Sequence, residues 1–164
     1  MEPVEERVLA FLDALGVAYE VVPCDPELAD TASFCATYGY ALEDSANAIV
    51  VVGKADPPVY AACVVLATTR LDVNHAVRAR LGVRRVSFAS PEQTAAVTGM
   101  ELGGVTPLGL PAELPVWVDE RVVARPRIIL GGGGRTSKVI GPPALLTSQE
   151  GVEVVPGLAI EPDA

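Results

Sequence analysis

Two apolar segments and the turn between them decide the fold: Ala48-Ile49-Val50-Val51-Val52, then Lys54-Ala55-Asp56-Pro57-Pro58, then Val59 to Ala67. Continuous apolar runs of this length, rich in β-branched residues, are typical of buried strands. The intervening polar turn with two prolines favours a reversal of the chain. We therefore expect a hairpin of strands 45–52 and 59–67 at the centre of a sheet.

Shorter elements surround this hairpin. We expect strands over 17–22, 86–89, 115–118, 127–130, 137–140 and 152–155, and helices over 4–15, 30–38, 72–81 and 90–98, with another helix beginning near 142. Many short strands with interspersed helices predict an α+β fold, with a mixed, curved β-sheet and peripheral helices. The length of 164 residues fits a single domain over 1–160 with a frayed tail over 161–164, and the chain is expected to loosen from Pro156 onward.

Composition excludes several classes of protein. Half of the residues are hydrophobic and 20% are charged, which argues against disorder, and no apolar run is long enough to cross a bilayer. The acidic N-terminus lacks the basic and apolar regions of a signal peptide, so we expect a cytoplasmic protein. Three cysteines without a CxxC pair and one histidine, His75, predict packed thiols and no metal site or cofactor.

The net charge of −9 argues against nonspecific nucleic-acid binding over the whole surface, and we expect neither DNA nor membrane as a partner. A local exception is the concentration of arginines at positions 70, 78, 80, 84 and 85. A solvated helix face is one explanation for it. The other is a basic patch that steers a nucleic-acid end toward a site.

A second informative stretch is Gly99-Met100-Glu101-Leu102-Gly103-Gly104-Val105-Thr106-Pro107-Leu108-Gly109. Glycines in such a turn permit φ > 0 and remove the side-chain wall between backbone and ligand. Backbone N–H groups exposed in this way can receive a carbonyl or phosphate oxygen. A tight turn between strands would use the same residues, so the segment alone does not distinguish the two.

Several landmarks in order resemble the YbaK/ProX-type aminoacyl-tRNA deacylases, also found as the editing insertion of bacterial prolyl-tRNA synthetases. The glycine stretch 103–109 is close to the "GGxSPxG" loop of that family. The other matching segments are 45–51, 70–74 (xLDxxK), 81–86 (LGxxKV), 90–99 (xPEE…TG), 115–119 (xPxxxD) and the glycine turn 131–134. Each is weak alone, but their shared order and spacing from Ser45 to about Ile140 is specific.

The resemblance implies trans-editing, the hydrolysis of an ester between a small mischarged amino acid and the terminal ribose of a tRNA, with tRNA(Pro) the expected one. Such an ester needs a positioned water and a stabilised oxyanion, and neither a metal nor a covalent nucleophile. The aminoacylated acceptor end would be the partner, and prolyl-tRNA synthetase a candidate second one. The residues expected to act in catalysis are Gly103, Gly104 and Asn47, and those expected to bind substrate are Thr31, Ser33, Arg70, Thr106, Pro107 and Gly109.

Asn47 marks a departure from the family pattern, which has a lysine just before the first long strand. Asparagine can hydrogen-bond a phosphate or carbonyl but supplies no charge. Three hypotheses follow: a deacylase of a divergent subgroup in which Asn47 does the positioning, a binding module with little hydrolytic activity, or an enzyme for another acylated small molecule. We favour the first, because the glycine loop is intact.

Overall fold

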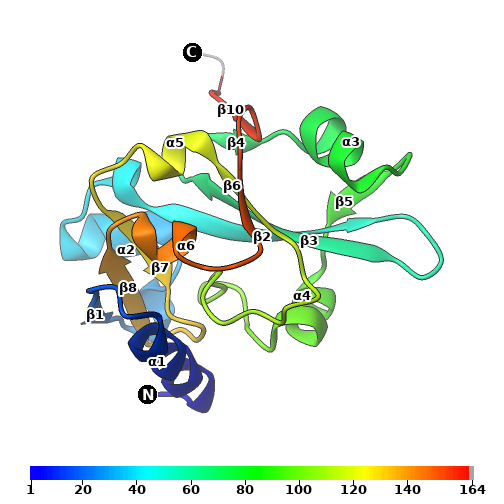
Figure 1. The fold of residues 1–164 in the computed structure, drawn as a ribbon. Helices are drawn as coiled ribbons and strands as arrows, with labels where there is room; N and C mark the ends of the chain where they lie inside the picture. Colours follow the sequence, from blue (N-terminus) through cyan, green and yellow to red (C-terminus); the bar gives the residue numbers. More distant parts are fainter. Residues whose placement is uncertain (163–164) are drawn as a thin grey trace.

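The computed structural model describes residues 1–162 and is shown in Figure 1. Its helical segments are α1 (Pro3–Leu15), η1 (Pro26–Leu28), α2 (Thr31–Tyr38), η2 (Leu42–Asp44), η3 (Val73–Val77), α3 (Arg78–Leu81), α4 (Pro91–Thr98), α5 (Glu120–Val123) and α6 (Ala144–Thr147). Its strands are β1 (Glu20–Pro23), β2 (Ala46–Gly53), β3 (Val59–Leu66), β4 (Arg70–Leu71), β5 (Val86–Phe88), β6 (Val116–Asp119), β7 (Ile128–Gly131), β8 (Ser137–Gly141), β9 (Val152–Val155) and β10 (Ala159–Ile160).

The main sheet has the strand order β5-β2-β3-β6-β9. The expected hairpin forms its centre, because β2 and β3 pair antiparallel from Ala46 opposite Leu66 to Gly53 opposite Val59. Strand β5 pairs antiparallel with β2, whereas β6 and β9 extend the other side in parallel. The sheet is therefore mixed, and with its surrounding helices it confirms the predicted α+β fold class.

A smaller sheet with the order β1-β8-β7 packs across the start of the hairpin. The parallel bridge between Ser45 and Ile129 joins it to the residue just before β2. Helix α1 lies beside this small sheet at one end of the molecule, as Figure 1 shows. This crossing brings the start of β2 next to β7 and β8.

Each face of the main sheet has its own apolar core. On one face, Val64 and Val118 pack with residues of α1, β7, β8 and α6, including Leu12, Leu130 and Leu146. On the other face, Val51, Cys63 and Trp117 pack with residues of η3 and of the C-terminal segment. Burial on both faces explains why β2 and β3 are almost continuously apolar instead of alternating.

Two expectations about local structure need correction. The helix predicted over 72–81 is divided into a π-helical turn, Val73–Val77, and a short α-helix, Arg78–Leu81. The chain beyond Pro156 does not loosen, because Ala159 and Ile160 pair with β4 and Leu158 is fully buried. Sequence patterns missed this pairing because both strands have only two residues. Of the expected frayed tail 161–164, residues 163–164 lie outside the described residues.

Helix α1 is joined to the β7–β8 hairpin by a buried carboxylate. Glu5 is 1% exposed and accepts hydrogen bonds from the hydroxyls of Thr136 and Ser137, while Glu2 accepts one from the Arg135 backbone N–H at 2.9 Å. Burial acts to raise the pKa of Glu5, but the hydrogen bonds outweigh it and leave that pKa below its ordinary value. The first turn of α1 thereby fixes the position of the β7–β8 hairpin.

We expect Glu5→Ala to reduce the free energy of unfolding by about 2–4 kcal/mol at pH 7, because it leaves buried hydroxyl donors without an ionised acceptor. A group whose pKa is lowered by folding stabilises above its unfolded value and loses that effect as pH falls through the folded value. The difference between wild type and variant should therefore shrink below about pH 4.5. Urea unfolding at pH 7 and pH 3.5 measures it. Glu6→Ala, an exposed neighbour in the same helix, is the control, and an equal loss in both variants would contradict the assignment.

Candidate functional site

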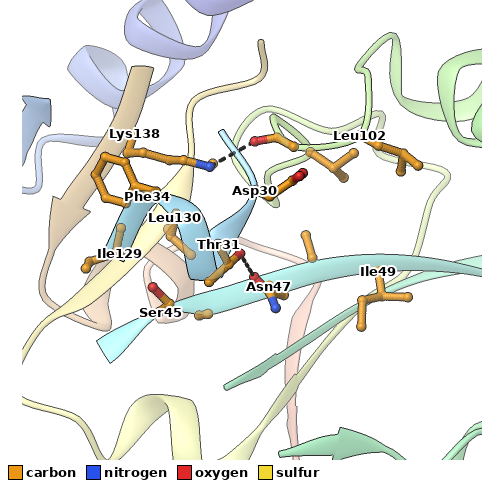
Figure 2. Close-up of a pocket in the computed structure, with 15 residues that line it drawn as sticks. Asp30, Thr31, Phe34, Ser45, Asn47, Ile49, Leu102, Ile129, Leu130 and Lys138 are labelled. Atoms are coloured by element: carbon orange, nitrogen blue, oxygen red, sulfur yellow. Dashed lines mark hydrogen bonds between the residues drawn. The ribbon is translucent and has the colours of Figure 1, made fainter. Parts of the chain in front are cut away.

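A cavity of about 230 Å³ lies where the small sheet crosses the start of β2. Its walls come from the first turn of α2, the beginning of β2, the β7–β8 hairpin, and Leu102, Gly103 and Val105 of the glycine stretch. Figure 2 shows Thr31 and Asn47 facing each other across one side of it and Lys138 projecting from the other. The volume is below the range of about 300–1,000 Å³ that holds drug-sized ligands, so the cavity suits a small group.

One polar wall is formed by a hydrogen bond between α2 and β2. The Thr31 hydroxyl donates to the Asn47 side-chain oxygen at 2.7 Å. Because the carboxamide oxygen is engaged in this way, the Asn47 NH₂ group keeps two N–H donors, and neither has a partner within the described residues. Asn47 therefore presents donors to the cavity without carrying a charge.

Lys138, on β8, brings a cation to the opposite wall. It is only 6% exposed, and its ammonium nitrogen donates to the Ala29 carbonyl oxygen at 2.6 Å and to the Gly103 carbonyl oxygen at 2.9 Å. The same nitrogen lies 5.6 Å from the centre of the Phe34 ring, a cation–π distance. An ammonium group has three N–H donors, so one remains for a ligand in the cavity.

The charge of Lys138 has no direct counter-ion. Within residues 1–162 no carboxylate forms a salt bridge with it. Burial lowers the pKa of Lys138 below its ordinary value, and the nearby Arg135 adds to this, while Asp30 acts in the opposite direction. A buried cation held by neutral carbonyls creates a positive potential that favours an anion or a developing negative charge in the cavity.

The glycine stretch forms the third wall, and its two central residues differ in their availability. Gly103 has φ +88° and its N–H makes no hydrogen bond within the described residues. The Gly104 N–H instead donates to the Glu101 carbonyl at 3.0 Å, and a Cβ at this position would overlap the Gly134 carbonyl oxygen. The turn thus offers one free N–H at Gly103, while Gly104 permits two backbone segments to touch.

The rim of the cavity carries opposite charges. Asp30 has a side chain that is 73% exposed and lies 3.8 Å from the guanidinium group of Arg135. Arg135 also donates to the Leu102 carbonyl at 2.7 Å and to the Pro26 carbonyl at 3.0 Å. Arg135 therefore holds the glycine stretch against the segment before α2, and Asp30 offers a carboxylate at the opening.

The residues predicted from the sequence divide into two groups. Thr31, Asn47 and Gly103 line the cavity. The others are not among its lining residues: Ser33, exposed on α2; Arg70, exposed on β4; Gly104, packed on Gly134; Thr106, whose buried hydroxyl has no partner within residues 1–162; Pro107, buried; and Gly109, packed on Phe11. For Gly104 the contact is structural, because its N–H is already used.

Lys138, Asp30 and Phe34 line the cavity but were not predicted. The sequence did carry a signal for Lys138. A lysine within a short, mostly apolar strand (137–141) is unusual, because strands of this kind become buried and lysine is rarely buried. Nothing local indicates which segment its ammonium group meets. Asp30 precedes the first turn of α2, but its side chain makes no capping hydrogen bond to the helix.

The three cysteines and the glycines 131–134 lie in structural positions. The three cysteines are free and buried, as expected, and burial raises the pKa of the Cys63 thiol to about 12. Of the glycines 131–134, Gly131 ends β7 opposite Lys138 and the other three begin the β7–β8 turn. Within residues 1–162 no cluster of three histidine, cysteine or acidic side chains could hold a metal ion, and no helix is long and apolar enough to span a membrane.

Comparisons with known proteins agree on the fold. A family model described as an aminoacyl-tRNA editing domain matches residues 25–148. A crystal structure of a protein described as a candidate trans-editing enzyme for prolyl-tRNA synthetase is similar with TM-score 0.82 and 23% identity, over 99% of both chains. A hypothetical protein of known structure matches with TM-score 0.79 and 21% identity, over 90% of this chain and 97% of its own. No curated protein gives a significant match.

We expect Gly104→Ala to displace the glycine stretch, because the new methyl group overlaps a backbone carbonyl and not a flexible side chain. Overpacking of this kind costs about 2–3 kcal/mol of unfolding free energy. Gly151→Ala is the matched control, since nothing lies within 4 Å of its Cβ and only its positive φ opposes alanine, at about 1–2 kcal/mol. Chemical denaturation gives both values, and hydrogen exchange should quicken over 101–109 in the first variant alone.

Proposed function

We propose that this chain, which belongs to the aminoacyl-tRNA editing domain family, hydrolyses the ester between a small amino acid and the 3′-terminal ribose of a tRNA. The family match covers most of the chain and carries the general role. The observation that carries the specific proposal is the cavity itself. It is small, closed by backbone on one side, and has an unpaired buried cation beside a free N–H.

The reaction needs little from the protein beyond placement and charge stabilisation. A water oxygen adds to the ester carbonyl carbon, and the carbonyl oxygen becomes an oxyanion. As the intermediate collapses, the bond from carbon to the ribose oxygen breaks, and the proton lost by the water passes to that oxygen. The products are a free amino acid and a ribose hydroxyl. No metal or covalent intermediate is required, and the neighbouring ribose hydroxyl is available to orient the water.

Lys138 and Gly103 are the groups proposed to bind the oxyanion. The remaining N–H of the Lys138 ammonium and the free backbone N–H of Gly103 both belong to the same corner, since Lys138 donates to the Gly103 carbonyl. Preorganised donors in a site of low dielectric stabilise negative charge far more than water does, because they do not reorganise during the reaction. The hydrogen bonds to Ala29 and Gly103 hold the ammonium in place before substrate arrives.

Under this proposal, Lys138 supplies the charge that the family pattern places at position 47. In the proposed site, Asn47 on β2 contributes neutral N–H donors that orient the ester, and Lys138 on β8 contributes the charge. The two side chains line one cavity from different strands. The chemistry therefore keeps a cation near the carbonyl, although the cation comes from the other sheet.

Asp30 is proposed to receive the α-amino group of the substrate. An aminoacyl ester carries a protonated amine close to its carbonyl, so it presents a positive and a developing negative group within a few bonds. The rim carboxylate of Asp30 and the deeper ammonium of Lys138 match that order of charge. The limited volume favours small side chains such as those of alanine, serine or cysteine, and the likeness to a candidate trans-editing enzyme supports tRNA(Pro) as the carrier.

One observation favours a second function, a module that binds aminoacyl-tRNA without hydrolysing it. The Gly104 N–H, expected to complete the oxyanion site, is already bonded to Glu101. An oxyanion site with fewer donors loses rate more than it loses ground-state binding. The two functions differ in whether amino acid is released.

The wild-type protein is expected to release free amino acid from tRNA(Pro) mischarged with alanine, serine or cysteine. Asn47→Ala should lower kcat/KM by roughly 10- to 100-fold, because the ester loses an orienting donor. Release is measured with radiolabelled amino acid, and Ser33→Ala, on the exposed face of α2, is the control. Saturable binding without release across the panel would support the binding module and exclude the deacylase.

Lys138→Met is expected to lower kcat/KM by about 100- to 1,000-fold, the effect of removing an oxyanion donor. Because the pKa of Lys138 is lowered, wild-type kcat/KM should fall as pH rises through that value, at a pH below that of an ordinary lysine. Lys138→Arg should keep its charge, and any remaining activity should persist to higher pH. Rates are corrected for spontaneous ester hydrolysis, and circular dichroism checks the fold. An unchanged rate in Lys138→Met would refute the role.

A further inference from the structure

A basic groove lies at the other end of β2 from the cavity. It has a volume of about 530 Å³, and its cationic lining residues are Lys54, Arg78, Arg84 and Arg85. They come from the β2–β3 turn, from α3 and from the segment before β5. Among residues 1–162, no aspartate or glutamate lines it. In a chain of net charge −9, this is a local reversal of sign.

The four cations have no partners of their own. Within residues 1–162 none of them forms a salt bridge or donates a side-chain hydrogen bond, and all four are exposed. Every other lysine or arginine except Arg70 has such a partner. Arg80 is close in sequence to the groove residue Arg78, but it forms a salt bridge with Glu153 and a cation–π contact with the Trp117 ring. Like charges placed together without acids repel one another, so the groove is prepared for an external polyanion.

The groove continues the cavity along one strand. Ile49 lines the cavity and Val52 lines the groove, so about 10 Å separates them at the rise of a β-strand. Between them on the neighbouring edge strand is Phe88, which pairs with Val51 and has 60% of its surface exposed. A large aromatic side chain this exposed has no role in the core.

We infer that Phe88 and the basic groove form a docking track for the RNA whose 3′-terminal ester occupies the cavity, an inference that rests on the proposed function. The unpaired bases next to the terminal nucleotide would stack on Phe88, and the phosphates that follow would lie against the groove cations. Stacking on an aromatic ring and phosphate contacts in a cationic groove are the two components by which proteins hold single-stranded nucleic acid. Here both lie in line with the cavity.

The arrangement favours RNA over other polyanions. An acidic peptide or an anionic membrane would use the cations but would not need an isolated exposed ring between them and a small polar cavity. The order cavity, ring, cations matches the order ester, bases, phosphates of an acylated 3′ end. The acidic remainder of the surface repels a polyanion elsewhere, which restricts binding to this track.

The test uses uncharged tRNA, so that it does not depend on hydrolysis. Binding is measured by fluorescence anisotropy at several salt concentrations for wild type and for Arg84→Gln/Arg85→Gln. Losing two phosphate contacts should weaken binding roughly 10- to 100-fold at 0.1 M salt and reduce the slope of log K against log salt by about 1.4–1.8. Arg7→Gln/Arg127→Gln, with the same change in net charge at exposed sites outside the groove, should leave the slope unchanged.

Phe88→Ala separates stacking from charge. It should weaken binding by about 5- to 100-fold at every salt concentration, with the slope unchanged, because stacking releases no counter-ions. Phe88→Trp should restore affinity, and Val154→Ala, another exposed apolar residue on an edge strand, serves as the control. Thermal unfolding verifies that each variant is folded.

Equal binding by the groove variant and its control would overturn the inference, as would stronger binding of the wild type to phosphatidylserine vesicles than to tRNA. If amino acid release is intact in that case, the proposed function stands and only the docking track is lost. If release is absent but the groove and Phe88 variants weaken tRNA binding as expected, the track stands and the deacylase function fails.

Discussion

The buried ammonium group of Lys138 is the interaction on which the site depends. It joins three segments that are distant in the sequence, because it sits on β8 and donates to carbonyls before α2 and in the glycine stretch. Desolvating a cation is costly, and neutral carbonyls with one aromatic face offset that cost only in part. Stability alone would favour an apolar residue at this buried position over lysine. The cost is consistent with a group retained for the chemistry of the cavity.

The walls around Lys138 are held by backbone contacts that few sequences allow. Gly104 touches Gly134, and the Gly133 N–H donates to the Gly104 carbonyl at 2.7 Å, so the turn of the hairpin and the glycine stretch form one unit. Glu5 then fixes this unit to α1 through the hydroxyls next to Lys138. The first helix of the chain therefore supports the cavity without lining it. These glycine contacts and the hydrogen bonds of Glu5 are buried and allow little variation in geometry. They therefore fix the position of the Lys138 ammonium group before any ligand binds.

Local patterns predicted much of the fold and part of the site. The central hairpin and the helices expected over 4–15 and 90–98 follow from periodicity and turn chemistry that act over a few residues. Thr31, Asn47 and Gly103 were expected at the site from the family resemblance, and all three line the cavity. Lys138 was missed because its environment arises from three separate segments, and the β4–β10 pair because two-residue strands carry no periodic signal. What the sequence left open was tertiary contact, above all which strand would supply the cation.

The cavity lies at one end of β2 and the basic groove at the other, and this arrangement provides a way to make ester hydrolysis selective. Ester hydrolysis with a positioned water requires few protein groups, so discrimination has to come from what reaches the cavity. In the proposed arrangement, the small volume limits the acyl group, the Asp30 carboxylate accepts its amine, and the groove admits a polyanion only from the β5 side. An unattached amino acid or its small esters would satisfy the first two conditions but gain nothing from the third. Binding energy from remote phosphates can then be used to place the ester against Lys138, which would make attachment to RNA part of the specificity.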